Sequence, residues 1–173
     1  YLRDIMDALS PMHPPQRIVV MKGAQIGATE AGNNWIGYII HHAPGPMLAV
    51  QPSVELAKRF SQQRIDPLIE ESPSLREKVA PARSRDSGNT VLAKRFPGGQ
   101  LVLTGANSAT GLRSMPARYV FLDEVDAYPG DVDGLLRRRH ALLLADGRRP
   151  HELLRLVRRS AAGLAPGVGR PDR

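Results

Sequence analysis

The segment from residue 18 to residue 30 constrains the fold more than any other part of the chain. An apolar run, Ile18-Val19-Val20, leads directly into MKGAQIGATE, which contains two glycines and opens a stretch with helical spacing. A buried strand, a glycine-containing turn and a helix are the layout of a phosphate-binding loop, whose usual pattern is G-x-x-x-x-G-K-[ST]. If Gly27 and Thr29 fill the last glycine and the hydroxyl positions, Ala28 stands where the pattern has its lysine.

A displaced lysine can supply the missing cation. A triphosphate needs backbone N–H groups, a helix N-terminus and a mobile positive charge. Glycines allow close backbone approach, a threonine hydroxyl can bind Mg²⁺, and a lysine acts as a point charge with little directional demand. We therefore predict a site for ATP and Mg²⁺ formed by Lys22, Gly23, Ala24, Gln25, Ile26, Gly27, Ala28 and Thr29. The alternative is an ordinary strand–turn–helix junction, since this pattern also arises without a ligand.

A second motif, RYVFLDEVD at residues 118–126, places two carboxylates after four consecutive apolar residues. At the carboxyl end of a central parallel strand, Asp123 would face the ligand side of the sheet and could bind Mg²⁺ together with Thr29. Glu124 would orient or activate the attacking water. Acidic residues also end strands simply because the chain re-enters solvent. The two motifs together nevertheless favour nucleotide hydrolysis, because each supplies the context that the other requires.

A third segment, TGANSATGLRSMPARY at residues 104–119, is predicted to be a glycine-punctuated loop between two strands. Loops on a rigid scaffold often carry binding groups, so Arg113 could contact phosphate or a DNA backbone. A solvated connection with a surface arginine explains the same pattern equally well.

The remaining pattern predicts an α/β fold with a largely parallel sheet and one antiparallel hairpin. Helices are expected at residues 1–10, at 29–41, and from the cap Ser53 to about residue 65, with Pro67 ending or kinking the third. Strands are expected at 18–21, which we interpret as buried, at 47–50, on either side of Pro97-Gly98-Gly99 and at 118–122. Residues 72–90 are predicted to be a loop with one helical turn.

Composition sets limits on the class of protein. A chain of 173 residues can bury one sizeable core, and it contains no cysteine for disulfides or thiolate metal sites. No segment reaches the roughly 20 apolar residues of a membrane span, so we expect a chain without a membrane partner. The net charge of +7 lies entirely in residues 135–173, where 10 Arg face three acidic residues. The charge is therefore not evidence that the rest of the chain binds nucleic acid.

With these residues identified, the chain resembles the large terminase subunit of tailed bacteriophages, in its lambda-type branch. The resemblance covers roughly residues 1–134 and rests on VVMKGAQIGATEAGNNWIGYIIHHAPGPMLAVQPS, GANSATGLRSMPARYVFLDEVDAYP and their order. It implies the N-terminal ATPase domain of a DNA-packaging motor, with a three-layer P-loop NTPase fold of the additional-strand type, truncated here. Terminases are known for a deviant loop whose lysine moves to the beginning, the position of Lys22.

The resemblance also implies roles and partners. Lys22, Gly27 and Thr29 would be loop residues, Asp123 the metal-side carboxylate and Glu124 the catalytic one. Double-stranded DNA, the small terminase subunit and the portal of the procapsid would be partners of a homo-oligomeric ring in the host bacterial cytoplasm. The metal-dependent nuclease domain of full-length relatives is expected to be absent from this chain, as is the segment that links hydrolysis to DNA movement.

Residues 135–173 form a separate, basic tail in this interpretation. Arg, Leu, Ala, Gly and Pro make up 31 of its 39 residues, which are largely residues with GC-rich codons. We interpret the tail as an out-of-frame or non-native segment. The alternative is a genuine basic tail with two amphipathic helices that lie on DNA or an anionic surface, one formed by Leu135-Leu136 with Leu142-Leu143 and the other by Leu153-Leu154 with Val157.

Two other functions remain open at the level of sequence. The chain could be a catalytically silent nucleotide-binding remnant of a prophage, because Ala28 replaces the usual lysine. It could also be a helicase-like P-loop ATPase outside packaging, which would share both motifs but not the long matching segments.

Overall fold

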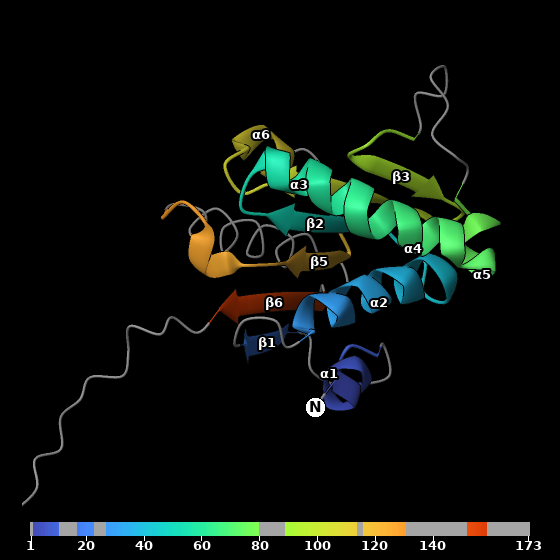
Figure 1. Cartoon of the computed structure of the whole chain (residues 1–173), viewed down its shortest axis with the longest axis horizontal. Helices are drawn as coiled ribbons and strands as arrows, with labels where there is room; N and C mark the ends of the chain where they lie inside the picture. The colour runs from blue at the N-terminus through green and yellow to red at the C-terminus, as the bar shows by residue number, and fades with distance from the viewer. Residues whose placement is uncertain are drawn as a thin grey trace, which may run out of the picture.

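A computed structural model describes residues 2–10, 17–22, 27–79, 89–113, 116–130 and 152–158 of the chain (Figure 1). Its elements are α1 (Leu2–Ala8), β1 (Arg17–Lys22), α2 (Ala28–His41), β2 (Met47–Gln51), α3 (Val54–Phe60), the π-helix η1 (Ser61–Ile65), α4 (Asp66–Glu71), α5 (Pro73–Arg76), β3 (Ala93–Phe96), β4 (Gly99–Gly105), α6 (Ala109–Arg113), β5 (Tyr119–Leu122), the 3₁₀ turn η2 (Val125–Ala127) and β6 (Glu152–Arg158). The helices, strands and hairpin expected between residues 1 and 122 are confirmed, with the changes described below.

The strands form one six-stranded sheet in the order β1-β6-β5-β2-β4-β3. All neighbours are parallel except β3 and β4, which form the antiparallel hairpin. Parallel strands need covered faces, and β2 and β5 are buried along their whole length. Because the parallel strands run in the same direction, they all end at the same edge of the sheet, which we call the carboxyl edge.

Two apolar clusters cover the two faces of the sheet. The larger contains side chains of α1 to α5 together with Met47, Ala49, Tyr119 and Phe121. The smaller contains the alternate strand residues, among them Leu48, Val50, Val120 and Leu122, with residues of α6 and η2. Successive strand residues point to opposite faces of the sheet, so the cluster that contains a residue identifies the face to which its side chain points. Figure 1 shows α2, α3 and α4 on one face of the sheet.

Helix α2 packs directly on β5. It has buried apolar residues at Trp35, Ile36, Ile39 and Ile40, the spacing of a helix with one inward face. A Cβ atom added to Gly32 would lie 2.3 Å from Cζ of Phe121, so only glycine permits this close approach. The contact brings the first turn of α2 close to the strand that carries the acidic pair.

The helix that begins at the cap Ser53 runs further than expected. The Ser53 hydroxyl accepts a hydrogen bond from the Leu56 N–H at 3.2 Å, which confirms the predicted cap. Pro67 does not end the helix. The chain first widens into η1, where the Asp66 N–H donates to the Ser61 carbonyl, and Pro67 then occupies the first turn of α4, where its missing N–H costs nothing.

Three expectations were wrong in part. The predicted loop between β4 and β5 contains the short helix α6. Strand β1, at the edge of the sheet, is covered on one face only: Ile18 and Val20 pack against the larger cluster, whereas Val19 is 59% and Met21 69% exposed on the other face. Residues 152–158 form a strand, not the proposed amphipathic helix, and that strand is β6, inserted between β1 and β5. The helix proposed at 135–143 lies outside the described residues.

No helix in the part of the chain that the structure describes combines the length and apolar character needed to cross a membrane.

Candidate functional site

The two predicted motifs meet at the carboxyl edge of the sheet. The Thr29 hydroxyl, in the first turn of α2, donates to Oδ2 of Asp123 at 3.2 Å, although 94 positions separate the two residues. Asp123 directly follows β5 and is 4% exposed. Strand alternation explains its direction, because Tyr119 and Phe121 face α2 and Asp123 continues that series.

The turn that follows Asp123 places Glu124 in an unusual backbone conformation. Glu124 has φ 51° and ψ 47°, and among the described residues it alone combines a positive φ with a side chain. Such left-handed conformations cost energy and are concentrated at functional sites. The Glu124 N–H donates to Oδ1 of Asp123 at 3.0 Å, so the backbone of one acidic residue holds the carboxylate of the other.

One carbonyl anchors both ends of this turn. The Val50 oxygen, on the neighbouring strand β2, accepts the Asp123 N–H at 3.1 Å and the Tyr128 hydroxyl at 2.7 Å. Between them, the Ala127 N–H donates to the Glu124 carbonyl. The acidic pair is therefore held by hydrogen bonds to β2 before it and through Tyr128 after it.

The predicted loop residues are only partly described. Lys22 ends β1 at the carboxyl edge, and its side chain, with residues 23–26, lies outside the described part of the chain. Gly27 caps α2 with φ 77°, a left-handed conformation that favours glycine, and Ala28 is buried. Arg113 ends α6, and its side chain is also outside the described part. The structure thus brings Thr29 and Asp123 together, with Glu124 adjacent.

The oxygen atoms at this point suit a magnesium ion. Mg²⁺ prefers hard oxygen ligands, keeps several waters and takes only one or two carboxylates when a phosphate completes its shell. A threonine hydroxyl beside a buried carboxylate fits that pattern. Within the described ranges no group of three or more His, Asp or Glu side chains could hold a metal on its own. The residues therefore fit an ion that arrives with a phosphate ligand.

Sequence reasoning missed one residue of this site, Tyr128, whose hydroxyl donates to the Val50 carbonyl. Nothing local marks Tyr128, because its role depends on a carbonyl 78 positions away.

Comparison with known proteins identifies the class. Residues 1–150 match the family described as "Phage terminase large subunit gpA, ATPase domain". The "Terminase, large subunit" of Enterobacteria phage P21 is 26% identical over 115 residues, which make up 66% of this chain and 18% of that protein. The chain thus spans about a fifth of the length of the curated relative it matches. The family match runs beyond residue 134, and the domain boundary expected there stays a prediction.

Solved structures share the fold. The large terminase of bacteriophage HK97 has a TM-score of 0.67 at 17% identity, covering 93% of this chain and 33% of that one. The large terminase of a thermophilic bacteriophage, in complex with ADP, has a TM-score of 0.61 at 13% identity, covering 90% and 37%. The ATPase domain of the Thermus phage P74-26 large terminase has 0.55 at 16%, covering 89% and 63%. At these identities the likeness shows the fold, an α/β sheet of the P-loop NTPase type.

Proposed function

Because this chain belongs to the family of the phage terminase large subunit gpA ATPase domain, we propose that it binds Mg-ATP and hydrolyses it as part of a DNA-packaging motor. One observation carries the proposal for the site itself. The hydroxyl of Thr29 and the carboxylate of Asp123, from two motifs far apart in the sequence, meet at 3.2 Å. A structural relative in complex with a nucleotide, the thermophilic phage terminase with ADP, supports the choice of ligand.

The proposed division of labour follows the chemistry of each residue. Thr29 and Asp123 would hold the metal ion, whose charge offsets that of the phosphates when it is bound. Lys22 would place an ammonium near the phosphates, and residues 23–27 would offer backbone N–H groups. Glu124 would accept a hydrogen bond from the attacking water and orient it.

The hydrogen-bonded turn supports this role for Glu124. The Asp123 N–H and the Tyr128 hydroxyl both donate to the Val50 carbonyl, and these bonds anchor the turn that carries Glu124. Fixed hydrogen-bonding groups need no reorganisation during the reaction, which is a large part of enzymatic rate enhancement.

Partners are proposed from family membership alone. The motor would act on double-stranded DNA, in a ring of copies, with the small terminase subunit and the portal of the procapsid, in the cytoplasm of the bacterial host. Arg113 would contact phosphate or the DNA backbone.

The test compares binding and turnover in matched variants. Mg-ATP affinity and phosphate release are measured for the wild-type chain, Glu124→Gln and Asp123→Asn, with and without double-stranded DNA. We expect Glu124→Gln to keep ATP binding and lose turnover, and Asp123→Asn to lose the Mg²⁺ dependence of binding. The control Glu71→Gln makes the same chemical change at an exposed position of α4 and should match the wild type.

Two results would count against the proposal. If the wild-type chain does not bind Mg-ATP, the proposed function is refuted. Binding without turnover under every condition, in wild type and Glu124→Gln alike, would instead support the silent nucleotide-binding remnant, with Ala28 in the usual lysine position as its cause.

A further inference from the structure

The turn that carries Glu124 returns to the strand beside which it begins. The Tyr128 hydroxyl donates to the Val50 carbonyl at 2.7 Å, and the Asp123 N–H donates to the same oxygen at 3.1 Å. A carbonyl oxygen has two lone pairs, so it can accept both bonds. The Tyr128 ring packs against the smaller apolar cluster. The side chain of Tyr128 therefore ties the far end of the turn to β2.

The direction of the Glu124 side chain depends on this turn. If β5 continued in an extended conformation past Asp123, strand alternation would send Glu124 to the face of Leu122, opposite to Asp123. Glu124 instead has φ 51° and ψ 47°, and the strand ends before it. A left-handed conformation is unfavourable for a residue with a side chain, and it persists only where the surrounding structure enforces it.

The hydrogen bonds of the turn divide into two kinds. The Glu124 N–H donates to Oδ1 of Asp123 at 3.0 Å, the Ala127 N–H to the Glu124 carbonyl at 2.9 Å, and the Tyr128 N–H to the Val125 carbonyl at 3.1 Å. These three bonds join residues of the turn to one another. The Tyr128 hydroxyl instead joins the end of the turn to another strand, so it fixes the turn relative to the sheet.

We infer that Tyr128 is a positioning residue for ATP hydrolysis, whose hydroxyl holds Glu124 in the left-handed turn and thereby holds its carboxylate where it orients the attacking water. The inference rests on the function proposed above and adds a residue that acts through Glu124. Asp123 has its own hydrogen bond to the Val50 carbonyl, so its place does not depend on the hydroxyl. Loss of the hydroxyl should therefore slow turnover and spare the binding of Mg-ATP.

The test is Tyr128→Phe in the whole 173-residue chain, with and without double-stranded DNA. The Val50 carbonyl keeps the Asp123 N–H and the ring keeps its packing, so the melting temperature should change little. We expect kcat for phosphate release to fall about fivefold, as for the loss of one neutral hydrogen bond, and the affinity for Mg-ATP to stay unchanged. The control Tyr38→Phe makes the same chemical change in α2, beside the ring of His42, and should match the wild type.

Hydrogen exchange supplies a readout that does not need turnover. The Ala127 amide bonds to the Glu124 carbonyl, so its exchange rate reports the opening of the turn. We expect this rate to rise about fivefold in Tyr128→Phe, while the amides of β2 and β5 keep their wild-type rates. Such a local change would show that the hydroxyl holds the turn and not the sheet.

The outcomes separate this inference from the proposed function. If the wild-type chain releases no phosphate under any condition, both are overturned. If it does and Tyr128→Phe has the same kcat, or the Ala127 amide exchanges at the wild-type rate, the inference alone is overturned. A joint fall of kcat, Mg-ATP affinity and melting temperature also overturns it, because Tyr128 would then stabilise the fold as a whole.

Discussion

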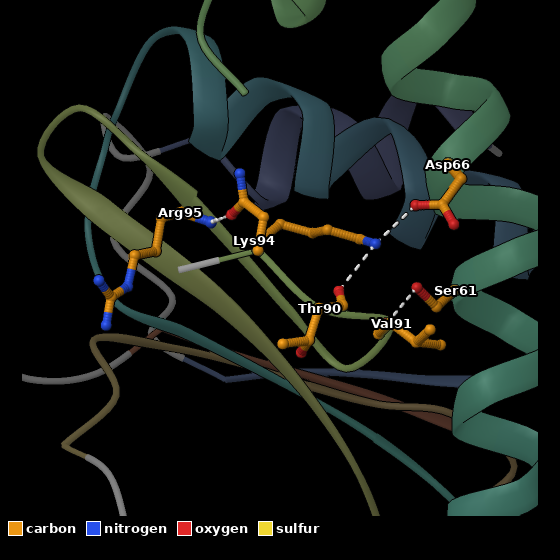
Figure 2. A network of polar contacts seen from close by, with 7 residues as sticks. Ser61, Asp66, Thr90, Val91, Lys94 and Arg95 are labelled. Carbon is orange, nitrogen blue, oxygen red and sulfur yellow. Dashed lines mark hydrogen bonds and ion pairs between the residues drawn. The ribbon is translucent and has the colours of Figure 1, made fainter. Parts of the chain in front are cut away.

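The buried ion pair between Lys94 and Asp66 gives the sharpest prediction about stability. Figure 2 shows Lys94 reaching from β3 to Asp66 at the start of α4, with an Nζ–Oδ1 distance of 2.7 Å. The same Nζ donates to the Thr90 carbonyl at 3.1 Å. The Lys94 side chain is 6% exposed and that of Asp66 is 34% exposed. The lysine is thus the more buried partner, and the aspartate supplies its counter-charge within the part of the chain that the structure describes.

Removing Asp66 and removing Lys94 should change the free energy of unfolding by unequal amounts. Asp66→Ala leaves a buried ammonium without its counter-charge, which costs about 3–5 kcal/mol in fully buried pairs. Because Asp66 is one-third exposed, water can partly replace it, and we expect the lower end, about 3 kcal/mol. Lys94→Met instead replaces the charge by an apolar chain. We expect a change within about 1 kcal/mol, since Thr90 keeps its hydrogen bond from the Ala93 N–H.

The assay is unfolding in urea, monitored by the fluorescence of Trp35, which is the single tryptophan of the chain and is fully buried. In a chain of this size a loss of about 3 kcal/mol corresponds to roughly 6–12 °C in melting temperature. The double variant should match Lys94→Met, so the coupling energy should equal the cost of Asp66→Ala, about 3 kcal/mol.

The control pair is exposed. Glu30 and Arg64 are 3.2 Å apart with side chains 53% and 59% exposed, so Glu30→Ala should cost no more than about 1 kcal/mol. The reasoning is refuted if Asp66→Ala is as mild as Glu30→Ala, or if the effects of Asp66→Ala and Lys94→Met simply add.

Three further predictions concern local contacts. Ser53→Ala removes the cap of α3 and should cost about 1 kcal/mol in thermal unfolding, whereas Ser53→Asp should restore it; equal stability of both variants would contradict the cap. Gly32→Ala forces a methyl group into Phe121, and we expect the loss of stability from this clash to exceed the roughly 1 kcal/mol that alanine gains over glycine in a helix. The control Gly37→Ala, where the nearest contact of the added Cβ is 3.4 Å, should be neutral or stabilising, and a stabilised Gly32→Ala would refute the close packing. Burial, with nearby positive charges, lowers the pKa of His41 below its usual 6.5. The unfolded chain therefore takes up the proton first as the pH falls, and the free energy of unfolding should decrease below pH 6.5. Stability should depend less on pH in this range for His41→Gln, and parallel stability profiles of the two proteins would exclude His41 as the cause.

The parts of the fold that follow from local pattern could be predicted from the sequence. The strand and helix at residues 17–41 are marked by an apolar run, a glycine and helical spacing, and the hairpin at 93–105 by Pro97-Gly98. The fold class followed from their alternation. The meeting of Thr29 with Asp123 could also be anticipated, because the carboxyl ends of parallel strands share one edge of the sheet.

Features that depend on distant partners could not be predicted in this way. Exposure of Val19 and Met21 depends on which other elements cover that face of β1, and the periodicity of one strand does not encode this. Strand β6 was missed because Leu153, Leu154 and Val157 fit a helix as well as a strand, and pairing with β1 and β5 decides between them. The anchoring of Tyr128 likewise depends on a carbonyl of another strand.

The place of β6 in the sheet has a consequence for the order in which the molecule can assemble during synthesis. In the described sheet β1 has β6 as its neighbour, and β6 alone joins it to β5. A nascent chain that has emerged only as far as residue 130 can already pair β2 with β4 and β5, yet its first strand has no partner to complete the sheet. The first strand therefore acquires its neighbour only after residues 152–158 have been synthesised, and a chain that stops near residue 130 would have the acidic pair in place while its first strand is not joined to the sheet.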